Sequence, residues 1–468
     1  MKVGYHVGSF EKISYGLYFL GQNVFYGLVG INVQTFFADR GITVAVVSLI
    51  VLLTKIWDAV NDALFGVIID KVRFKKGRYL PWLRVSLPPI AISSIFLFAM
   101  PLSVPMGVKI LWGVIGYVAW DMSYTLCDVP IFVLPMSMTD NIQERSGILS
   151  LGRYMGTVGI MGAMLVIPML QNSLGWTGLG IVFSIIGVVT MLPICFKAKE
   201  RNIVRPTEDV TLKQMAKYVA GNKYLLIFYL GMLLASVTNF TITVSMYFAR
   251  YNLGNQNLAS VISMFSMIPM MVVGAFVPAL TKRFDKFVLY RAGLIFQVFF
   301  TLIRFFVGYG NFPLYVALNT IGTVVTTANG ILLYLFTPDC IEYGTYHTGE
   351  RSEGVATSIQ TFMAKLTGSL SASLGMLVLG FFGFVSGENA AQPDSAVTGI
   401  WLCNTIFPAI GLVLQIVALS FYKLRDKDVQ VMAEYNIGKV SKADAEAQLK
   451  ERYGPAADLR NMTITRSE

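Results

Sequence analysis

Two carboxylates and an amide interrupt the otherwise apolar run VSLIVLLTKIWDAVNDALFGVII at residues 47–69. Asp58, Asn61 and Asp62 have the spacing i, i+3 and i+4, so they share one face if the run is a helix. A charge inside a membrane costs about 3 kcal/mol or more, and such residues usually mark an ion or substrate pathway. Carboxylates at i and i+4 also repel each other. A small cation bound between them would relieve that repulsion.

A second apolar run carries polar residues at helical spacing. Asp121, Thr125 and Asp128 follow the pattern i, i+4 and i+7 within ILWGVIGYVAWDMSYTLCDVPIFVLP, which again defines one helical face. Beside that face, Trp120 and Tyr124 could stack on the apolar face of a sugar ring. Most other aromatic residues of such a chain are expected to pack between helices or to lie at the membrane interfaces.

The four residues Asp58, Asn61, Asp62 and Thr125 together supply several oxygen ligands. Hard cations prefer oxygen, and Na⁺ shares that preference, so we expect a cation-binding site with Asp58 and Asp62 as the possible Na⁺ ligands. Pairing of Lys55 with Asp58 is the alternative. That pair cannot neutralise all the carboxylates of the two runs, so a bound cation or a shifted protonation state is still expected.

Further polar residues interrupt other apolar runs. Lys365 lies too deep to reach water easily, so we expect it to contact the acidic cluster or a substrate, although a role as a helix-end anchor stays open. Arg153 either contacts substrate or extends to the membrane surface. Asn23 and its neighbour Gln22 could simply join helices. The candidate substrate-binding residues are Asn23, Trp120, Tyr124, Asp128, Arg153, Gln360, Thr361 and Lys365.

The composition is that of a polytopic membrane protein. Of the 468 residues, 55% are hydrophobic and 14% charged, whereas a soluble chain carries about 25% charged residues. The net charge of +10 does not indicate nucleic acid, because the basic residues lie in short loops between apolar runs, as the positive-inside rule predicts. The four cysteines have no metal-binding spacing. We find no HExxH motif or metal-ligand cluster, so an enzyme is not expected, and no cofactor is called for.

Apolar runs of about 20 residues predict about twelve transmembrane helices. The alternation of basic and nearly uncharged loops places both termini in the cytoplasm. The polar segment 197–222 divides the helices into two six-helix bundles, at 1–196 and 223–422, and 423–468 is a cytoplasmic tail with a capped helix from Ser441 to Tyr453. The predicted spans are 14–37, 44–69, 80–101, 107–135, 148–171, 176–196, 223–247, 257–281, 288–308, 313–337, 354–384 and 397–422.

An internal repeat supports this division. The stretches GVIIDKVRFKKGRY and GAFVPALTKRFDKFVLYR follow the second span of each half. Two six-span halves with a basic loop at this point are the pattern of the major facilitator superfamily.

Several motifs resemble the glycoside–pentoside–hexuronide:cation symporters, the melibiose-permease-like family. They are WDAVNDALFGVIIDKVRFKKGRYLPW, YTLCDVP, QERSGILSLGR, PDCIEYGTYHTGERSEG and SIQTFMAKL. The resemblance implies that Asp58, Asn61, Asp62 and Thr125 bind Na⁺, H⁺ or Li⁺. It implies that Asp128 and Arg153 contact sugar and that Lys365 links the two sites.

Three positions depart from the melibiose-type pattern. Asn23 stands where those members have an Asp that binds galactosyl hydroxyls, and Phe132 and Gly330 stand where they have Trp. The loss of the acid argues against melibiose and makes an anionic sugar easier to bind beside Arg153 and Lys365.

We therefore expect a cation-coupled symporter, with Na⁺ the favoured ion and H⁺ or Li⁺ as alternatives, that imports a glycoside, pentoside or hexuronide. A carrier of the same fold for a lipid or other amphiphile is the alternative. The expected partners are a sugar, a monovalent cation and membrane lipids. The protein is expected to be a monomer in the cell inner (plasma) membrane.

Overall fold

The computed structural model describes residues 7–72, 74, 77–139, 141–201, 218–349, 353–388 and 390–453. Every regular element in these ranges is a helix, and the one β-bridge joins Phe74 to Gly77. Helices are expected for apolar runs of this length, because a helix satisfies its own backbone hydrogen bonds where water is absent. The structure is therefore all-α across the described ranges.

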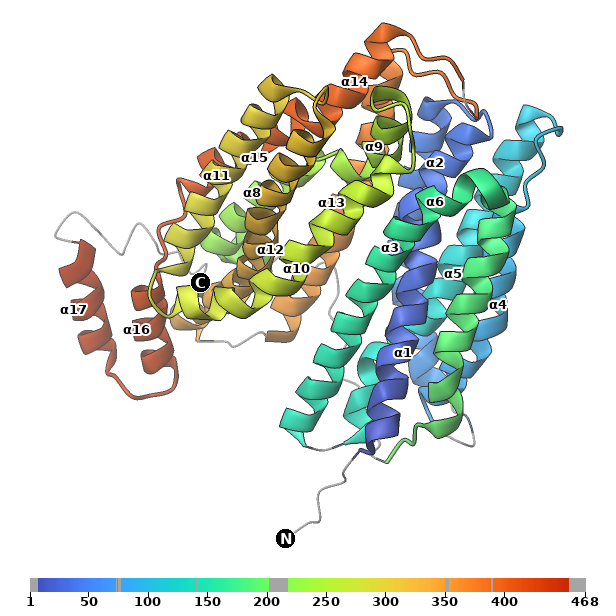
Figure 1. Ribbon diagram of the computed structural model, residues 1–468. Helices are drawn as coiled ribbons and strands as arrows, with labels where there is room; N and C mark the ends of the chain where they lie inside the picture. The colour runs from blue at the N-terminus through green and yellow to red at the C-terminus, as the bar shows by residue number, and fades with distance from the viewer. Residues whose placement is uncertain are drawn as a thin grey trace. The chain divides into compact units, whose positions relative to one another are not determined.

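The first half of the sequence forms long helices joined by short connections (Figure 1). The first predicted span is divided into three pieces by a π-helical segment, η1. Residues 142–197 form one element that is kinked at Gly175, whose φ of 62° lies outside the helical region. The elements are α1 (Ser9–Phe25), η1 (Tyr26–Ile31), α2 (Asn32–Asp39), α3 (Val44–Lys71), α4 (Leu80–Phe98), α5 (Met106–Met138) and α6 (Ile142–Lys197).

The second half is built in the same way. A short non-helical break at Thr238–Phe240 divides the first of its spans, and a second π-helical segment, η2, follows it. The elements are α8 (Lys223–Val237), α9 (Thr241–Tyr247), η2 (Phe248–Asn252), α10 (Leu258–Thr281), α11 (Lys286–Val307), α12 (Phe312–Thr348), α13 (Glu353–Phe381), α14 (Asp394–Asn404), α15 (Ile406–Leu419), α16 (Asp426–Asn436) and α17 (Lys442–Tyr453).

Eight helical stretches of the described chain are long and apolar enough to cross a membrane. This number is smaller than the twelve predicted crossings. The stretch Gln143–Lys197 contains two predicted spans in one continuous element, and the predicted spans 14–37, 107–135 and 257–281 are not among the eight. The first of these is divided among α1, η1 and α2, and the last contains the shorter apolar helix Leu258–Pro269. The count of twelve crossings and the cytoplasmic position of both termini stay predictions.

The chain forms two compact units that do not follow the sequence halves. Unit 1 contains Met1–Thr207, Phe240–Met264 and Ala372–Asn404, whereas unit 2 contains Glu208–Asn239, Phe265–Ser371 and Thr405–Glu468. Two segments from the second half of the sequence thus belong to unit 1. The chain passes from one unit to the other inside α10 and inside α13.

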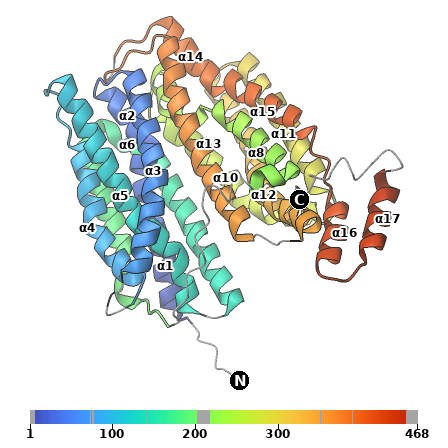
Figure 2. The ribbon, with the colours of Figure 1, turned by 180° about the vertical axis from the view of Figure 1, so that it is seen from behind.

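In unit 1, α1 packs along α6, and α4 packs against both α5 and α6 (Figures 1 and 2). Glycines make the contact between α1 and α6 close. A Cβ atom added to Gly159 would clash with the Leu20 carbonyl oxygen of α1, and one added to Gly27 of the adjoining η1 would lie 2.5 Å from the Ala163 Cβ. Small residues allow helix backbones to approach in this way in membrane proteins.

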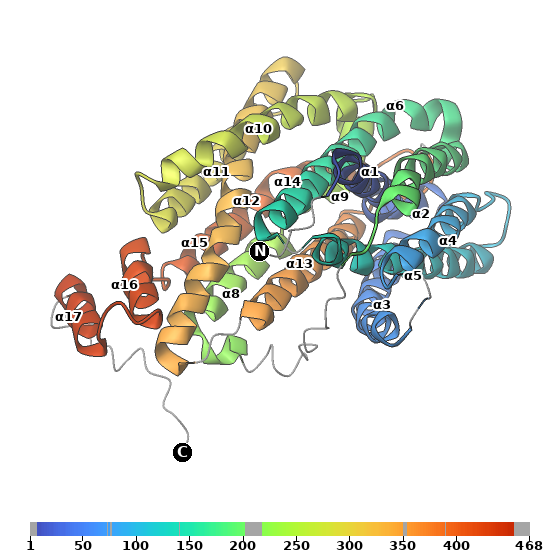
Figure 3. The same ribbon diagram turned by 90° about the horizontal axis from the view of Figure 1, so that it is seen from below.

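In unit 2, aromatic residues form the core and the C-terminal tail packs onto it. Tyr224, Phe228, Tyr290, Phe336 and Tyr422 are buried in one cluster that also includes Val431, Met432, Ala445 and Leu449 of the tail. The tail helices α16 and α17 lie side by side (Figure 3). The predicted capped helix is confirmed, because α17 begins at Lys442 and the Asp444 backbone N–H donates to the Ser441 hydroxyl.

One capping arrangement occurs in both halves of the sequence. Glu200 accepts hydrogen bonds from the backbone N–H groups of Arg78, Tyr79 and Leu80 at the start of α4, at 2.7–2.9 Å. Asp426 likewise accepts from the Lys286 N–H at the start of α11, at 2.9 Å. Carboxylates at a helix N-terminus are stabilising. Each cap follows the sixth predicted span of its half, which agrees with the internal repeat.

Candidate functional site

A hydrogen-bonded chain of polar side chains joins α3 to α5 in unit 1. Asn61 Nδ2 donates to Thr125 Oγ1 at 2.8 Å, and Thr125 Oγ1 donates to Asp62 Oδ1 at 3.1 Å. The Thr125 hydroxyl also lies 3.2 Å from the Asp121 carbonyl oxygen of its own helix. Asn61 and Thr125 are both buried. The structure thus brings together three of the four residues predicted to bind a cation.

Lys55 lies beside the fourth of these residues. Its Nζ atom is 3.7 Å from Asp58 Oδ2 in the same helix and 3.9 Å from Asp121 Oδ1 on α5. The pairing of Lys55 with Asp58, which the sequence left as an alternative, is therefore present. It coexists with the Asn61–Thr125–Asp62 chain, so α3 and α5 together place two carboxylates, Asp58 and Asp121, near one ammonium group.

This arrangement supplies the ligand chemistry of a hard monovalent cation. The side chains of Asp58, Asp62 and Thr125 offer carboxylate and hydroxyl oxygens, and Asn61 holds the hydroxyl in place. Asn61 and Thr125 are buried whereas Asp58 and Asp62 are half-buried, and electrostatic attraction to carboxylates is stronger away from bulk water. The helical spacing of the sequence explains the geometry, because i, i+3 and i+4 place the α3 residues on the face that meets α5. We call these four residues the oxygen cluster.

A second polar contact lies one turn further along α5. Gln22 Nε2 of α1 donates to Asp128 Oδ1 at 2.6 Å, and Gln22 is almost fully buried. The ring of Tyr124 lies 5.1 Å from that of Trp120 and 5.8 Å from that of Tyr26. An acidic hydrogen-bonding group beside a line of aromatic rings has the chemistry needed to hold sugar hydroxyls and to cover an apolar sugar face.

Asn23 and Arg153 lie where α1 meets α6. The Asn23 amide donates to the Phe19 carbonyl of its own helix at 2.8 Å. A Cβ added to Gly156 of α6 would lie 2.7 Å from Asn23 Nδ2, so that amide packs closely against α6. Arg153 lies one turn earlier on α6 and is exposed. Asn23 therefore packs against α6, while its hydrogen bond stays within α1, and its part in a substrate site stays a prediction.

The remaining predicted substrate residues lie on α13 in unit 2. Gln360 and Lys365 are half-buried, and the Lys365 carbonyl accepts a hydrogen bond from Ser369. The side chain of Thr361 lies outside the described residues. Their part in a substrate site therefore stays a prediction.

Sequence reasoning did not assign three residues that the structure connects to the site. Asp121 and Lys55 form an interhelical ion pair, and Gln22 is the hydrogen-bond partner of Asp128. The i, i+4 relation between Asp121 and Thr125 was a usable signal for Asp121. Gln22 was considered only as an amide that could join helices, and it does join α1 to α5 through Asp128.

Comparisons with known proteins agree with a transporter. The chain is 32% identical to an uncharacterized symporter of Bacillus subtilis, YjmB, over 89% of this chain and 93% of the relative. It is 27% identical to the isoprimeverose transporter of Lactiplantibacillus pentosus, over 91% and 90%. It is 25% identical to a glucuronide carrier protein homolog of Escherichia coli, over 89% and 92%.

Solved structures show the same fold. A bacterial homolog of the human lysosomal transporter Spinster superposes with a TM-score of 0.65 at 12% identity, covering 89% of this chain and 97% of that one. The model of the MFS/sugar transport protein family matches residues 14–426. These matches identify a multi-pass membrane transporter of the plasma membrane rather than an enzyme, as predicted. The chain belongs to the MFS/sugar transport protein family.

Proposed function

We propose that this transporter is a Na⁺-coupled symporter that imports a sugar of the glycoside, pentoside or hexuronide class by alternating access. The family description and the printed names of the relatives, which include a symporter, an isoprimeverose transporter and a glucuronide carrier homolog, support a sugar as cargo. We further propose twelve membrane crossings with both termini in the cytoplasm.

The observation that carries the proposal is the oxygen cluster. The Thr125 hydroxyl of α5 makes hydrogen bonds to both Asn61 and Asp62 of α3, so a single side chain links the two helices. A Na⁺ ion bound to Asp62 and to the Thr125 oxygen would draw the two helices together at this point. Oxygen ligands of mixed carboxylate and hydroxyl type suit Na⁺.

The position of Asp128 explains how the cation could be coupled to sugar. Asp128 lies three residues after Thr125 on α5, so the same helix carries a cation ligand and the hydrogen-bonding acid of the proposed sugar site. Movement of α5 on cation binding would reposition Asp128 and the nearby rings. Coupling of this kind is reciprocal, so sugar must raise the affinity for Na⁺ by the same factor that Na⁺ raises the affinity for sugar.

The polar residues favour a sugar that carries a negative charge, such as a hexuronide. Asn23 contributes a neutral amide that packs against Gly156 of α6, and the exposed Arg153 lies one turn earlier on α6. A carboxylate on the sugar would then meet a cationic side chain without an added acid at position 23. The glucuronide carrier homolog among the relatives agrees with this choice.

Sugar uptake into proteoliposomes with and without a Na⁺ gradient tests the proposal. We expect Na⁺ to stimulate uptake of a glucuronide or xyloside, and we expect Asp58→Asn and Asp62→Asn each to reduce that stimulation at least tenfold. Asp128→Asn is the comparison variant, which should lose sugar uptake yet still bind Na⁺ in a thermal-shift titration. Unchanged Na⁺ stimulation in both Asp58→Asn and Asp62→Asn would reject the cation site.

The same assay separates sugar from lipid cargo. Excess unlabelled sugar should compete with the transported sugar, whereas a lysolipid should not. Competition by lysolipid alone would identify the protein as an amphiphile carrier.

A further inference from the structure

We propose that Asp39, Arg250 and Gln256 form a latch between the two halves of the sequence, which must open and close once in each transport cycle. The proposal rests on the alternating-access function above, because that mechanism requires the halves to separate at each end in turn. All three residues belong to unit 1. We call them the Asp39 latch.

The centre of the latch is a buried, two-point ion pair. Arg250 Nη1 donates to Asp39 Oδ1 at 2.7 Å, and Arg250 Nη2 donates to Asp39 Oδ2 at 3.2 Å. Only 8% of the Arg250 side chain and 2% of the Asp39 side chain are exposed. Asp39 ends α2 and Arg250 lies in η2, so the pair joins residues 211 positions apart.

Neighbouring groups complete the hydrogen bonding of the pair. Trp176 Nε1 donates to Asp39 Oδ2 at 2.9 Å, while Gln256 Oε1 accepts from Arg250 Nη2 at 3.0 Å. The Gln256 amide in turn donates to the Pro168 carbonyl at 3.1 Å and to Gln171. A buried polar network that is satisfied in this way fixes one arrangement, and loss of any member leaves costly unpaired groups.

The latch includes a segment of unit 1 whose neighbours in sequence belong to unit 2. Residues Phe240–Met264 belong to unit 1, although the chain on either side of them, Glu208–Asn239 and Phe265–Ser371, belongs to unit 2. The helix is interrupted at Thr238–Phe240, just before this segment begins. A break at that point allows the segment to move independently of α8 when the latch opens.

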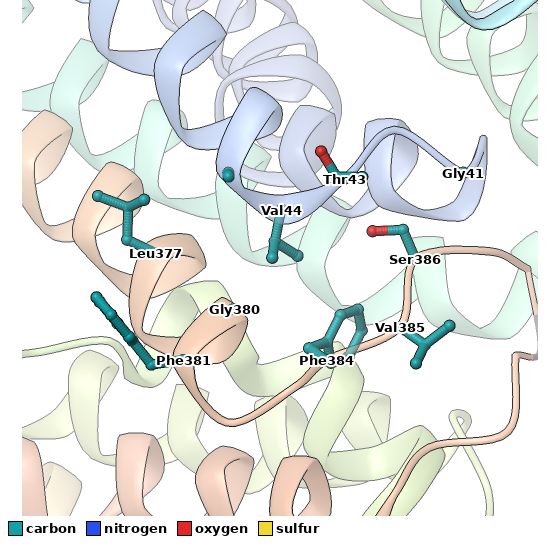
Figure 4. Close-up of a pocket in the computed structure, with 10 residues that line it drawn as sticks. Gly41, Thr43, Val44, Leu377, Gly380, Phe381, Phe384, Val385 and Ser386 are labelled. Atoms are coloured by element: carbon teal, nitrogen blue, oxygen red, sulfur yellow. The ribbon is translucent and has the colours of Figure 1, made fainter.

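Other contacts between the two sequence halves lie at this end. Ser48 Oγ donates to the Ser373 carbonyl at 2.7 Å. A pocket of about 550 Å³ lies between residues 41–45 and the end of α13 (Figure 4), where a Cβ added to Gly380 would lie 3.0 Å from Val44 Cγ2. Its walls are mostly apolar side chains such as Leu377, Phe381 and Phe384. Among the contacts described at this end, the Asp39–Arg250 pair joins two buried side chains of opposite charge.

Cysteine labelling tests the latch without any sugar or cation. Ser373 is 2% exposed, so a Ser373→Cys reporter should react slowly with a membrane-impermeant maleimide while the latch is closed. The four native cysteines are all buried, and their labelling is measured in protein that lacks the reporter. We expect Asp39→Asn and Arg250→Gln each to speed reporter labelling at least fivefold and to slow uptake in proteoliposomes.

A double-variant cycle and a matched control decide the interpretation. Asp39→Asn combined with Arg250→Gln should label no faster than either single variant, because both changes break the same pair. Lys109→Gln removes another cation at this end, one that donates to the Arg40 carbonyl within the first half, and it should leave labelling unchanged.

Unchanged labelling in the single variants would overturn the latch. Additive effects, or an equal effect of Lys109→Gln, would overturn it too, since they would indicate general loosening. Because labelling needs no substrate, failure of the Na⁺ or sugar proposal would not alter this result.

Discussion

In the proposed cation site, Thr125 is the residue of α5 that contacts Asn61 and Asp62 of α3. Its hydroxyl accepts from Asn61 and donates to Asp62, so a substitution that keeps the shape but removes the oxygen separates packing from chemistry. Hydrogen bonds to charged groups contribute about 1.5–3 kcal/mol. The contribution of this one oxygen is therefore measurable.

We expect Thr125→Val to lower the apparent affinity for Na⁺ by about tenfold or more, as those hydrogen-bond energies imply. Thr125→Ser keeps the hydroxyl and should stay within about threefold of the unsubstituted protein, a difference below 1 kcal/mol. Na⁺ titrations of sugar uptake and of thermal stability measure both variants. Equal affinities for the Val and Ser variants would show that the Thr125 oxygen is not a ligand.

Sequence reasoning at this scale succeeded where spacing within one helix carries the information. The face formed by Asp58, Asn61 and Asp62 follows from the helical repeat, and Thr125 of another run does contact two of these residues. The contact between Gln22 and Asp128 depends on how α1 packs against α5. The spacing of residues within one helix does not determine which helices pack together, so this contact could not be predicted.

Helix packing in unit 1 depends on where glycines lie. Gly159 faces the backbone of α1, whereas Gly162, on the same helix three residues later, has open space around its missing side chain. The two positions share the same helical context but differ in their neighbours. They form a matched pair for measuring what the close approach of α1 and α6 contributes.

Gly159→Ala should destabilise the protein by about 1–3 kcal/mol, the usual cost of an overpacked contact. Gly162→Ala should be neutral or stabilise it by up to about 1 kcal/mol, because alanine favours a helix over glycine. Thermal unfolding in detergent, followed by tryptophan fluorescence, compares them. If both variants melted alike, the close contact at Gly159 would be wrong.

The predicted spans fall on helices because long apolar runs are a strong signal, but their interruptions were missed. The first span contains η1, and the seventh is broken at Thr238–Phe240. Span ten was predicted to end at 337, yet α12 continues to Thr348. A hydropathy pattern marks where a chain is apolar, whereas a helix ends only where its backbone bonding stops.

At the scale of the whole molecule, the C-terminal tail is part of the folded structure of unit 2. Beyond the shared core, Lys286 Nζ lies 2.7 Å from Asp339 and 3.4 Å from Asp426, and Asn436 donates to Glu342 at 2.8 Å. The Arg425 guanidinium lies 4.1 Å from the centre of the Phe287 ring. The sequence predicted helix α17 here from its capping residues, but it did not predict that the tail packs on α11 and α12.

Truncation after Lys423 should therefore lower the melting temperature markedly, since each buried aliphatic side chain of the tail contributes about 1.5–3 kcal/mol. Truncation after Tyr453 retains every described contact of the tail and should melt like the full chain. Both truncated proteins are compared by thermal unfolding in the same detergent. Equal stability of all three proteins would show that the tail does not stabilise unit 2.

The separation of Asp39 from Arg250 along the chain bears on how the protein is made. At about 5–20 residues per second, a gap of 211 residues corresponds to about 10–40 s between the synthesis of the two partners. During that interval the Asp39 carboxylate cannot be buried without its guanidinium, because an unpaired buried charge is strongly unfavourable. The end of unit 1 that contains Asp39 therefore reaches its final packing only after Arg250 has been synthesised.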